Sequence, residues 1–176
     1  MRLHRAAVAG LLCAGLLIPG APGAAQDLGR GRGQIERGPA DVEQMVQRST
    51  LIVHGVVAKK APKWIGRVLY TQYELAVQET LKGAERKSVL VSVVGGRSGN
   101  VELKIPGAPD LSTGEQLVFF GAPVAGDASF APVGTFAGVV PFRQGRGNGP
   151  PTAAPRGRPE SLTDFLQEVR TLSKRR

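Results

Sequence analysis

The chain has 176 residues, and its 23 Lys and Arg against 14 Asp and Glu give a formal net charge of +9. This length suits one domain with tails and excludes a large two-domain enzyme. One cysteine and two histidines exclude a disulfide scaffold and leave few ligands for a transition metal. We therefore expect neither a metal nor a cofactor.

Residues 1–25 have the features of a secretory signal peptide. Two arginines precede an uncharged apolar run over residues 6–18, which is too short to span a bilayer as a helix. Small residues at the −3 and −1 positions place the expected cleavage before Gln26, and an uncleaved membrane anchor is the alternative. Cleavage would leave a chain without cysteine or a transmembrane span, as expected for an exported bacterial protein, periplasmic or extracellular.

The rest of the chain divides into four segments by composition. Residues 26–38 are rich in Gly and Arg and are predicted to be a disordered leader. Residues 39–142 hold nearly all the β-branched and aromatic residues and form the predicted domain. Residues 143–160 are a Gly/Pro/Arg-rich segment predicted to be a disordered linker, and residues 161–176 are a short helix with a basic end. The domain has ten Lys or Arg against nine Asp or Glu, which argues against nucleic acid as its partner.

The domain is predicted to begin with a helix over residues 39–46, with Pro39 in its first turn and acidic side chains at its positive end. A β-rich run over 51–58 contains Gly55, and residues 61–67 are predicted to be a connection. Residues 69–78 then alternate apolar and polar side chains with the period of two that a strand requires. Further strands are expected over residues 89–94, 101–105, 117–120, 130–133 and 136–142.

These short strands, with Gly and Pro at their joints, predict a mainly β fold, a small antiparallel barrel of the OB type. The C-terminal segment 161–173 has an apolar stripe at helical spacing, and Ser161 with Asp164 resembles a capping box. A helix this short is marginally stable alone. We expect it to dock on the barrel; a partner or a membrane surface is the alternative.

Several stretches together resemble a known family. The runs 49–57, 70–83 and 89–96, followed by Gly114-Glu115-Gln116-Leu117-Val118-Phe119, are similar to exported bacterial proteins of unknown function. They also resemble, more distantly, the netrin-like or tissue-inhibitor-of-metalloproteinases module, over roughly residues 40–142. The resemblance implies an OB-type barrel. The inhibitors use an N-terminal cysteine and many disulfides, which this chain lacks, so neither their zinc-blocking mechanism nor any functional residue is carried over.

Catalytic motifs are sparse in this sequence. His54, the one histidine left after cleavage, lies in a predicted strand and is interpreted as a barrel-wall residue. Glu74 and Glu79, five residues apart, should lie on opposite faces of a regular strand, which is unsuited to paired-carboxylate chemistry. The Gly-rich run 95–100 is predicted to be a hairpin loop, since no helix follows it to bind phosphate. We therefore predict that the protein is not an enzyme.

The strongest candidate surface is a basic cluster around one tryptophan. Its members are Lys59, Lys60, Lys63, Trp64, Arg67 and Tyr70. A solvated hairpin with a packed tryptophan is the alternative interpretation. We predict an exported interaction module for a protein partner in the envelope or outside the cell, with a secreted protease as one candidate. The competing hypothesis is a binder of anionic envelope polymers that uses the 59–67 hairpin and the basic tail.

Overall fold

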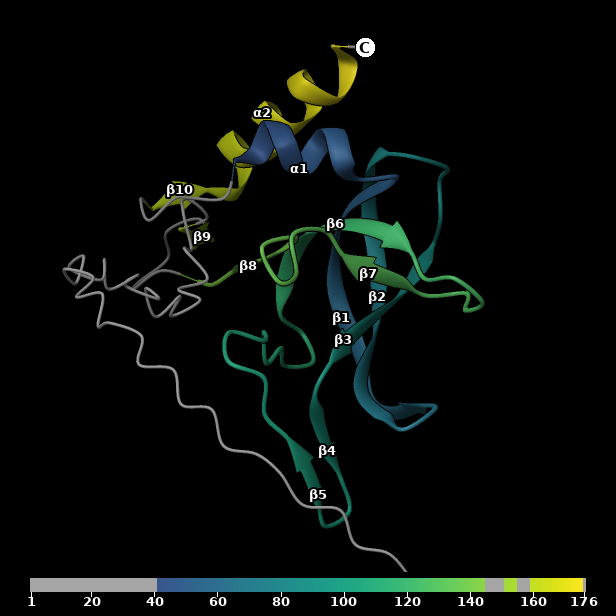
Figure 1. Ribbon diagram of the computed structural model, residues 1–176. Coiled ribbons are helices and arrows are strands. Elements are labelled where there is room, and N and C mark those ends of the chain that lie inside the picture. Colours follow the sequence, from purple (N-terminus) through teal and green to yellow (C-terminus); the bar gives the residue numbers. More distant parts are fainter. Residues whose placement is uncertain (1–40, 145–150, 155–158, 176) are drawn as a thin grey trace, which may run out of the picture. The chain divides into compact units, whose positions relative to one another are not determined.

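Strands dominate the part of the chain that the computed structural model describes, which comprises residues 41–144, 151–154 and 159–175 (Figure 1). The predicted signal segment 1–25 and leader 26–38 lie outside these residues. The prediction of a mainly β fold with a helix at each end is confirmed. None of the helices in the described ranges is both long and apolar enough to cross a membrane.

Helix α1 (Val42–Arg48) begins after Asp41, whose carboxylate accepts hydrogen bonds from the backbone N–H groups of Glu43 and Gln44. An Asp in this position satisfies N–H groups that have no partner inside the helix. The predicted helix therefore exists but begins later than expected. Pro39, which the sequence places in its first turn, lies outside the described residues.

A six-stranded sheet has the order β1-β2-β3-β7-β6-β8, and β6 also pairs with β1. Its strands are β1 (Leu51–Ile65), β2 (Val68–Lys82), β3 (Ser88–Val94), β6 (Gln116–Pro123), β7 (Phe130–Pro132) and β8 (Val139–Phe142). The pairings β1-β2-β3-β7-β6-β1 thus form a ring. The ring closes unevenly, because β3 and β7 are parallel and share one residue pair, Val91 with Phe130.

Strand β1 is longer than the sequence predicts. Residues 61–65, expected in a connection, continue β1 as far as Ile65, and Ile65 pairs with Val68 across the turn. The reason lies in the neighbours of β1, which pairs with β6 only up to Val56. Pro62, which has no N–H group to donate, is tolerated there because β2 is the only described strand that pairs with this part of β1.

The predicted hairpin at residues 95–100 is confirmed by β4 (Gly96–Ser98) and β5 (Val101–Leu103), which pair antiparallel. Strands β7 and β8 both pair with β6, on either side of Phe120, and a run of turns over residues 133–138 connects them. The backbone N–H of Phe120 donates to Gly138, and its carbonyl accepts from Val133, at 2.8 and 2.9 Å. The strand predicted over 136–142 therefore begins only at Val139.

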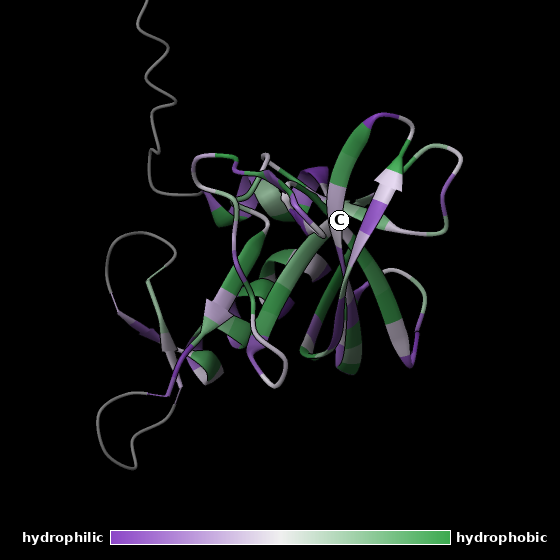
Figure 2. Ribbon diagram, turned by 90° about the horizontal axis from the view of Figure 1, so that it is seen from below, coloured by the Kyte–Doolittle hydropathy of each residue, from purple (hydrophilic) through white to green (hydrophobic). Residues whose placement is uncertain are grey.

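Two apolar cores lie on opposite sides of the sheet, as expected from strands whose side chains alternate. Figure 2 shows the hydrophobic residues distributed along the strands and helices that contribute to them. The interior core contains Val53, Tyr73 and Phe119. The exterior core lies beneath α1 and α2 (Leu162–Lys174). Its aromatic centre is Phe165, which contacts the rings of Phe120 and Phe142 at centroid distances of 6.2 and 5.6 Å.

The C-terminal helix thus docks on the chain's own sheet, as expected, and it begins after the Ser161 cap. The predicted disordered linker 143–160 is wrong for some of its residues. Strand β9 (Thr152–Ala153) pairs with β10 (Glu160–Ser161), and Thr152 also bridges to Arg143. Short backbone pairing therefore orders these residues, while 145–150 and 155–158 lie outside the described residues.

Candidate binding surface

All six predicted surface residues lie on one hairpin. Beyond the β6 contact, β1 and β2 continue as a pair from Lys59 opposite Glu74 to the turn at Gly66 and Arg67. We call residues 59–74 the distal hairpin. Gly66 has a φ of 60°, a left-handed conformation that glycine adopts without strain, so a two-residue turn can connect the strands.

The distal hairpin divides the predicted residues between two faces. Lys63 pairs directly with Tyr70, and both lie with Lys59 on the outer face. Lys60 and Trp64 occupy the opposite face, which continues into the barrel interior. Residues directly opposite in a sheet share a face, and successive residues alternate. The sequence grouped these side chains as one cluster, which the structure does not support.

Each lysine of the cluster forms an ion pair with a carboxylate of the same chain. Lys59 Nζ lies 3.5 Å from Glu74 Oε2, Lys63 Nζ lies 2.7 Å from Asp127 Oδ2, and Lys60 contacts Asp110. The hydrogen bond from Lys63 is the main cause of a lowered pKa of Asp127. The hydrogen bond to Asp110 is the main cause of a raised pKa of Lys60. These pairs partly neutralise the positive charge that the sequence predicts here.

The other three members of the cluster, Trp64, Arg67 and Tyr70, form no ion pair with a described residue. Trp64 is 48% exposed, and Tyr70 is half-buried. Arg67 is exposed in the turn and makes no hydrogen bond or ion pair within the described ranges. The tryptophan is therefore not packed into the core, which contradicts the alternative interpretation of a packed tryptophan.

Two apolar side chains of β3 extend the outer face beyond the prediction. Leu90 pairs with Glu74 and is exposed, and Val94 pairs with Tyr70 and is half-buried. The sequence analysis placed both residues in a strand. Because side chains alternate between the two faces of a strand, their positions could have shown that they point away from the core-facing valines. Ser92, between them, donates a hydrogen bond of 2.9 Å to Ser129, which brings the β6–β7 loop onto this face.

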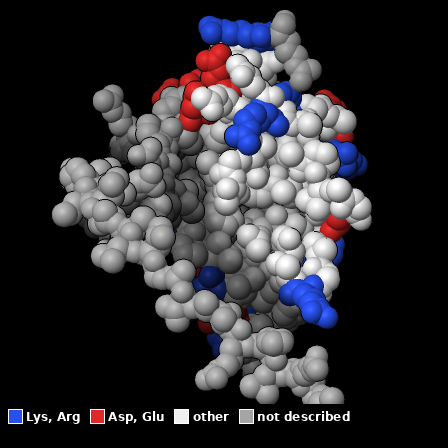
Figure 3. All heavy atoms as spheres, in the orientation of Figure 1, with Lys and Arg blue, Asp and Glu red and all other residues white. Residues whose placement is uncertain are grey.

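An uncharged region adjoins the outer face. Residues 121–142 contain one charged side chain, Asp127, which binds Lys63 of the distal hairpin. Figure 3 shows this side of the molecule: Lys, Arg, Asp and Glu lie mainly around its rim, and the area over β6 and β7 lacks them. The ion pair thus joins the distal hairpin to a surface of low charge.

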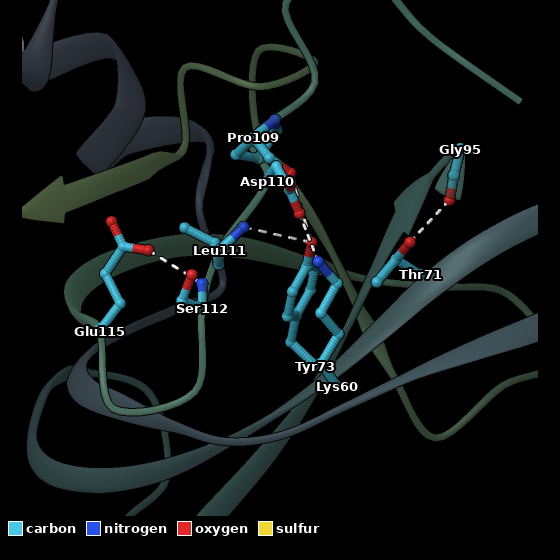
Figure 4. Close-up of polar contacts among 9 residues, drawn as sticks. All are labelled: Lys60, Thr71, Tyr73, Gly95, Pro109, Asp110, Leu111, Ser112 and Glu115. Atoms are coloured by element: carbon cyan, nitrogen blue, oxygen red, sulfur yellow. Dashed lines mark hydrogen bonds and ion pairs between the residues drawn. The ribbon is translucent and has the colours of Figure 1, made fainter. Parts of the chain in front are cut away.

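At its inner end the distal hairpin is closed by the segment between β5 and β6 (Figure 4). The hydroxyl of Tyr73 donates to the carbonyl of Pro109 at 3.3 Å and accepts from the N–H of Leu111 at 3.5 Å. Lys60 lies over the Tyr73 ring at 5.8 Å and binds Asp110. Burial raises the pKa of Tyr73. Lys60 therefore has a structural role at the barrel end.

A second polar cluster connects the barrel wall to α2. Arg170 donates two hydrogen bonds of 2.7 Å to the carboxylate of Glu79, and this pairing is the main cause of a lowered pKa of Glu79. His54 pairs with Glu79 across the strands and is 7% exposed; its Nε2 has no hydrogen-bond partner among the residues described. Burial lowers the pKa of His54. His54 is therefore a buried residue of the sheet, in the strand where the sequence places it.

The prediction that Glu74 and Glu79 lie on opposite faces is wrong. The β1–β2 register is irregular between His54 and Gly55, and Gln78 is skipped in the pairing, so both carboxylates lie on the outside of the barrel. They still serve different partners, Lys59 and Arg170. Groups of three or more His, Cys, Asp or Glu suited to a metal ion do not occur in the described part of the chain.

No protein-family model matches the chain, and the search of curated proteins finds no significant match.

Proposed function

We propose that this protein is an exported, non-enzymatic interaction module on an OB-like barrel, and that it binds a protein partner through the outer face of β2 and β3. A five-strand ring with one weak seam is consistent with an OB barrel, a partly open five-stranded architecture. The proposed contact residues are Tyr70, Leu90 and Val94, together with the adjoining uncharged region.

The observation that carries this proposal is the pairing of the lysines. Lys59 and Lys63 lie on this face, and both are partly neutralised by carboxylates of the same chain. Besides these paired lysines, the face presents the aromatic side chain of Tyr70 and the aliphatic side chains of Leu90 and Val94, next to a region of low charge. Protein interfaces are depleted of charge and enriched in aromatic residues at their centres. Binding of anionic polymers, the competing hypothesis, is therefore less well supported for this hairpin.

The proposal is tested with residues 26–176 immobilised and exposed to envelope and secreted fractions, with washes at low and high salt. A protein partner should be retained at high salt, and its dissociation constant can then be measured with purified components. Tyr70→Ala and Leu90→Thr should each weaken this binding about tenfold or more, as expected for residues at the centre of an interface.

Val101→Thr is the matched control for Leu90→Thr, because Val101 is also an exposed aliphatic residue but lies in the separate β4–β5 hairpin. It should leave the dissociation constant unchanged. Capture that occurs only at low salt and is insensitive to the Tyr70 and Leu90 variants would reject the protein-binding face. That result would support the anionic-polymer hypothesis, since such binding weakens steeply with salt.

A further inference from the structure

The tip of the distal hairpin is apolar on both of its faces. Trp64, on the inner face, is 48% exposed, and Val68, on the outer face, is 41% exposed. Ile65 pairs with Val68 and is half-buried. A protein that docked on one face of this tip would leave the other face in water. The interfacial layer of a lipid bilayer would instead surround an inserted tip on all sides.

The backbone of the tip suits a weakly polar environment. Trp64 pairs with Leu69 and Ile65 with Val68, so the strands remain paired up to the two-residue turn. Backbone groups without a partner are costly away from water, and here the pairing leaves mainly the turn itself to be solvated. Tryptophan is enriched in the interfacial layer of membranes, where its ring lies at the depth of the headgroups.

The charge at this end of the molecule favours an anionic surface. The guanidinium groups of Arg67 in the turn and Arg97 in β4 make no hydrogen bond or ion pair with other described residues. The carboxylates on the two hairpins and the adjoining loops already have basic partners: Glu74, Glu102, Asp110 and Asp127 each contact a lysine, and Glu115 contacts Arg143. Both hairpins lie at the end away from α1 and α2 (Figure 1). Two unpaired arginines thus accompany the apolar tip.

We propose that residues 64–68 insert into the headgroup layer of an anionic lipid bilayer. The side chains of Trp64, Ile65 and Val68 would reach the acyl boundary, and Arg67 would lie among the lipid phosphates. Apolar burial and attraction to anionic lipid act together in such surface binding. This site is separate from the proposed protein-binding face, so either proposal can fail while the other holds.

The tryptophan provides a direct readout, because Trp64 is the only tryptophan of the chain. The experiment uses residues 26–176, which contain the whole described fold and omit the apolar run 6–18, since that run could bind lipid by itself. Vesicles consist of phosphatidylcholine alone or with about one third phosphatidylglycerol. We expect the anionic vesicles to shift Trp64 emission to shorter wavelength and to protect it from aqueous acrylamide. Lipids brominated in their acyl chains should quench the emission.

Three variants separate the contributions. The double variant Ile65→Ser, Val68→Ser retains the reporter and should lower the partition coefficient for anionic vesicles about tenfold or more. Arg67→Gln should weaken binding to the anionic vesicles while leaving any binding to neutral vesicles unchanged. Leu90→Ser is the control: it removes a comparable apolar side chain outside the tip and should bind vesicles as the parent chain does. Circular dichroism confirms that each variant is folded.

An unchanged emission spectrum and unchanged acrylamide quenching at saturating anionic lipid would overturn the membrane proposal. Equal loss of vesicle binding in the Leu90 variant and the double variant would overturn it too, because the tip would then have no specific role. If a protein fraction shifts and protects Trp64 while vesicles do not, the tip is a protein contact and the membrane proposal is also overturned.

Discussion

Replacing Phe165 by alanine is the sharpest test of the exterior core. The side chain is completely buried, and it meets Phe120 edge-to-face and Phe142 at a tilt. Deletion of a buried phenylalanine costs about 3–5 kcal/mol. Two aromatic contacts, each worth about 0.5–1.5 kcal/mol, place the expected loss in the upper part of that range. A domain at the low end of ordinary stability, about 5 kcal/mol, would retain little of it after this change.

Urea unfolding of residues 26–176, followed by circular dichroism, measures this loss. With a slope of about 2 kcal/mol per molar, a loss of about 4 kcal/mol lowers the midpoint by about 2 M. Phe165→Leu, which largely conserves volume, should cost much less and shows whether the site tolerates another apolar residue. Thr171→Ala, on the exposed side of α2, should change the midpoint little.

A loss below about 1 kcal/mol for the alanine variant would refute the reasoning, because no fully buried aromatic residue is that dispensable. It would mean that α2 does not cover β6 and β8 in solution. A separate early transition for α2, with the remaining sheet unfolding as the parent chain does, would lead to the same conclusion. One cooperative transition at a lower midpoint is the expected outcome.

Three further predictions concern single positions. Gly55→Ala places a Cβ 2.5 Å from the carbonyl oxygen of Ala76, so we expect urea unfolding to show a loss of about 1–3 kcal/mol; an unchanged midpoint would contradict this strand spacing. Thr135 has a φ of 63°, which strains a β-branched residue, so Thr135→Asn should raise the melting temperature by the equivalent of about 0.5–1 kcal/mol, and a decrease would contradict the strain. Burial lowers the pKa of His54 from its ordinary 6.5, so the unfolded chain takes up the proton first, and the free energy of unfolding should fall as the pH drops below 6.5. His54→Gln should make the free energy of unfolding less dependent on pH in this range. An equal change of this free energy with pH in both proteins would exclude His54 as its cause.

Local patterns predicted most of the strands. Side chains in β2 alternate over its central part. Gly83 follows the end of β2, and Gly95 follows the end of β3, so periodicity and these glycines were sufficient to locate both strands. The end of β1 was missed because Pro62 suggests a connection when its neighbours are unknown. A proline on a strand with one neighbour is acceptable, and that fact depends on where β6 ends.

The candidate surface was predictable only in part. Sequence proximity located the distal hairpin but could not reveal that Asp110 and Asp127 pair with its lysines, since these carboxylates are 50 and 64 residues from their partners. The bond between Arg170 and Glu79 spans 91 residues and was likewise invisible. Long-range pairing of this kind depends on the topology of the whole sheet, which propensity and periodicity do not encode.

The uneven ring has a consequence for local opening. Val91 and Phe130 are the only paired backbone positions between β3 and β7 among the described residues, supported by the side-chain hydrogen bond from Ser92 to Ser129, whereas β2 and β3 share a ladder from Tyr70 to Ala76. Segments with few shared hydrogen bonds open at the lowest free energy. Fluctuations should therefore separate the β1-β2-β3 meander from β7 before any other part of the wall. During such an opening, β3 becomes a sheet edge that can accept a strand from another chain.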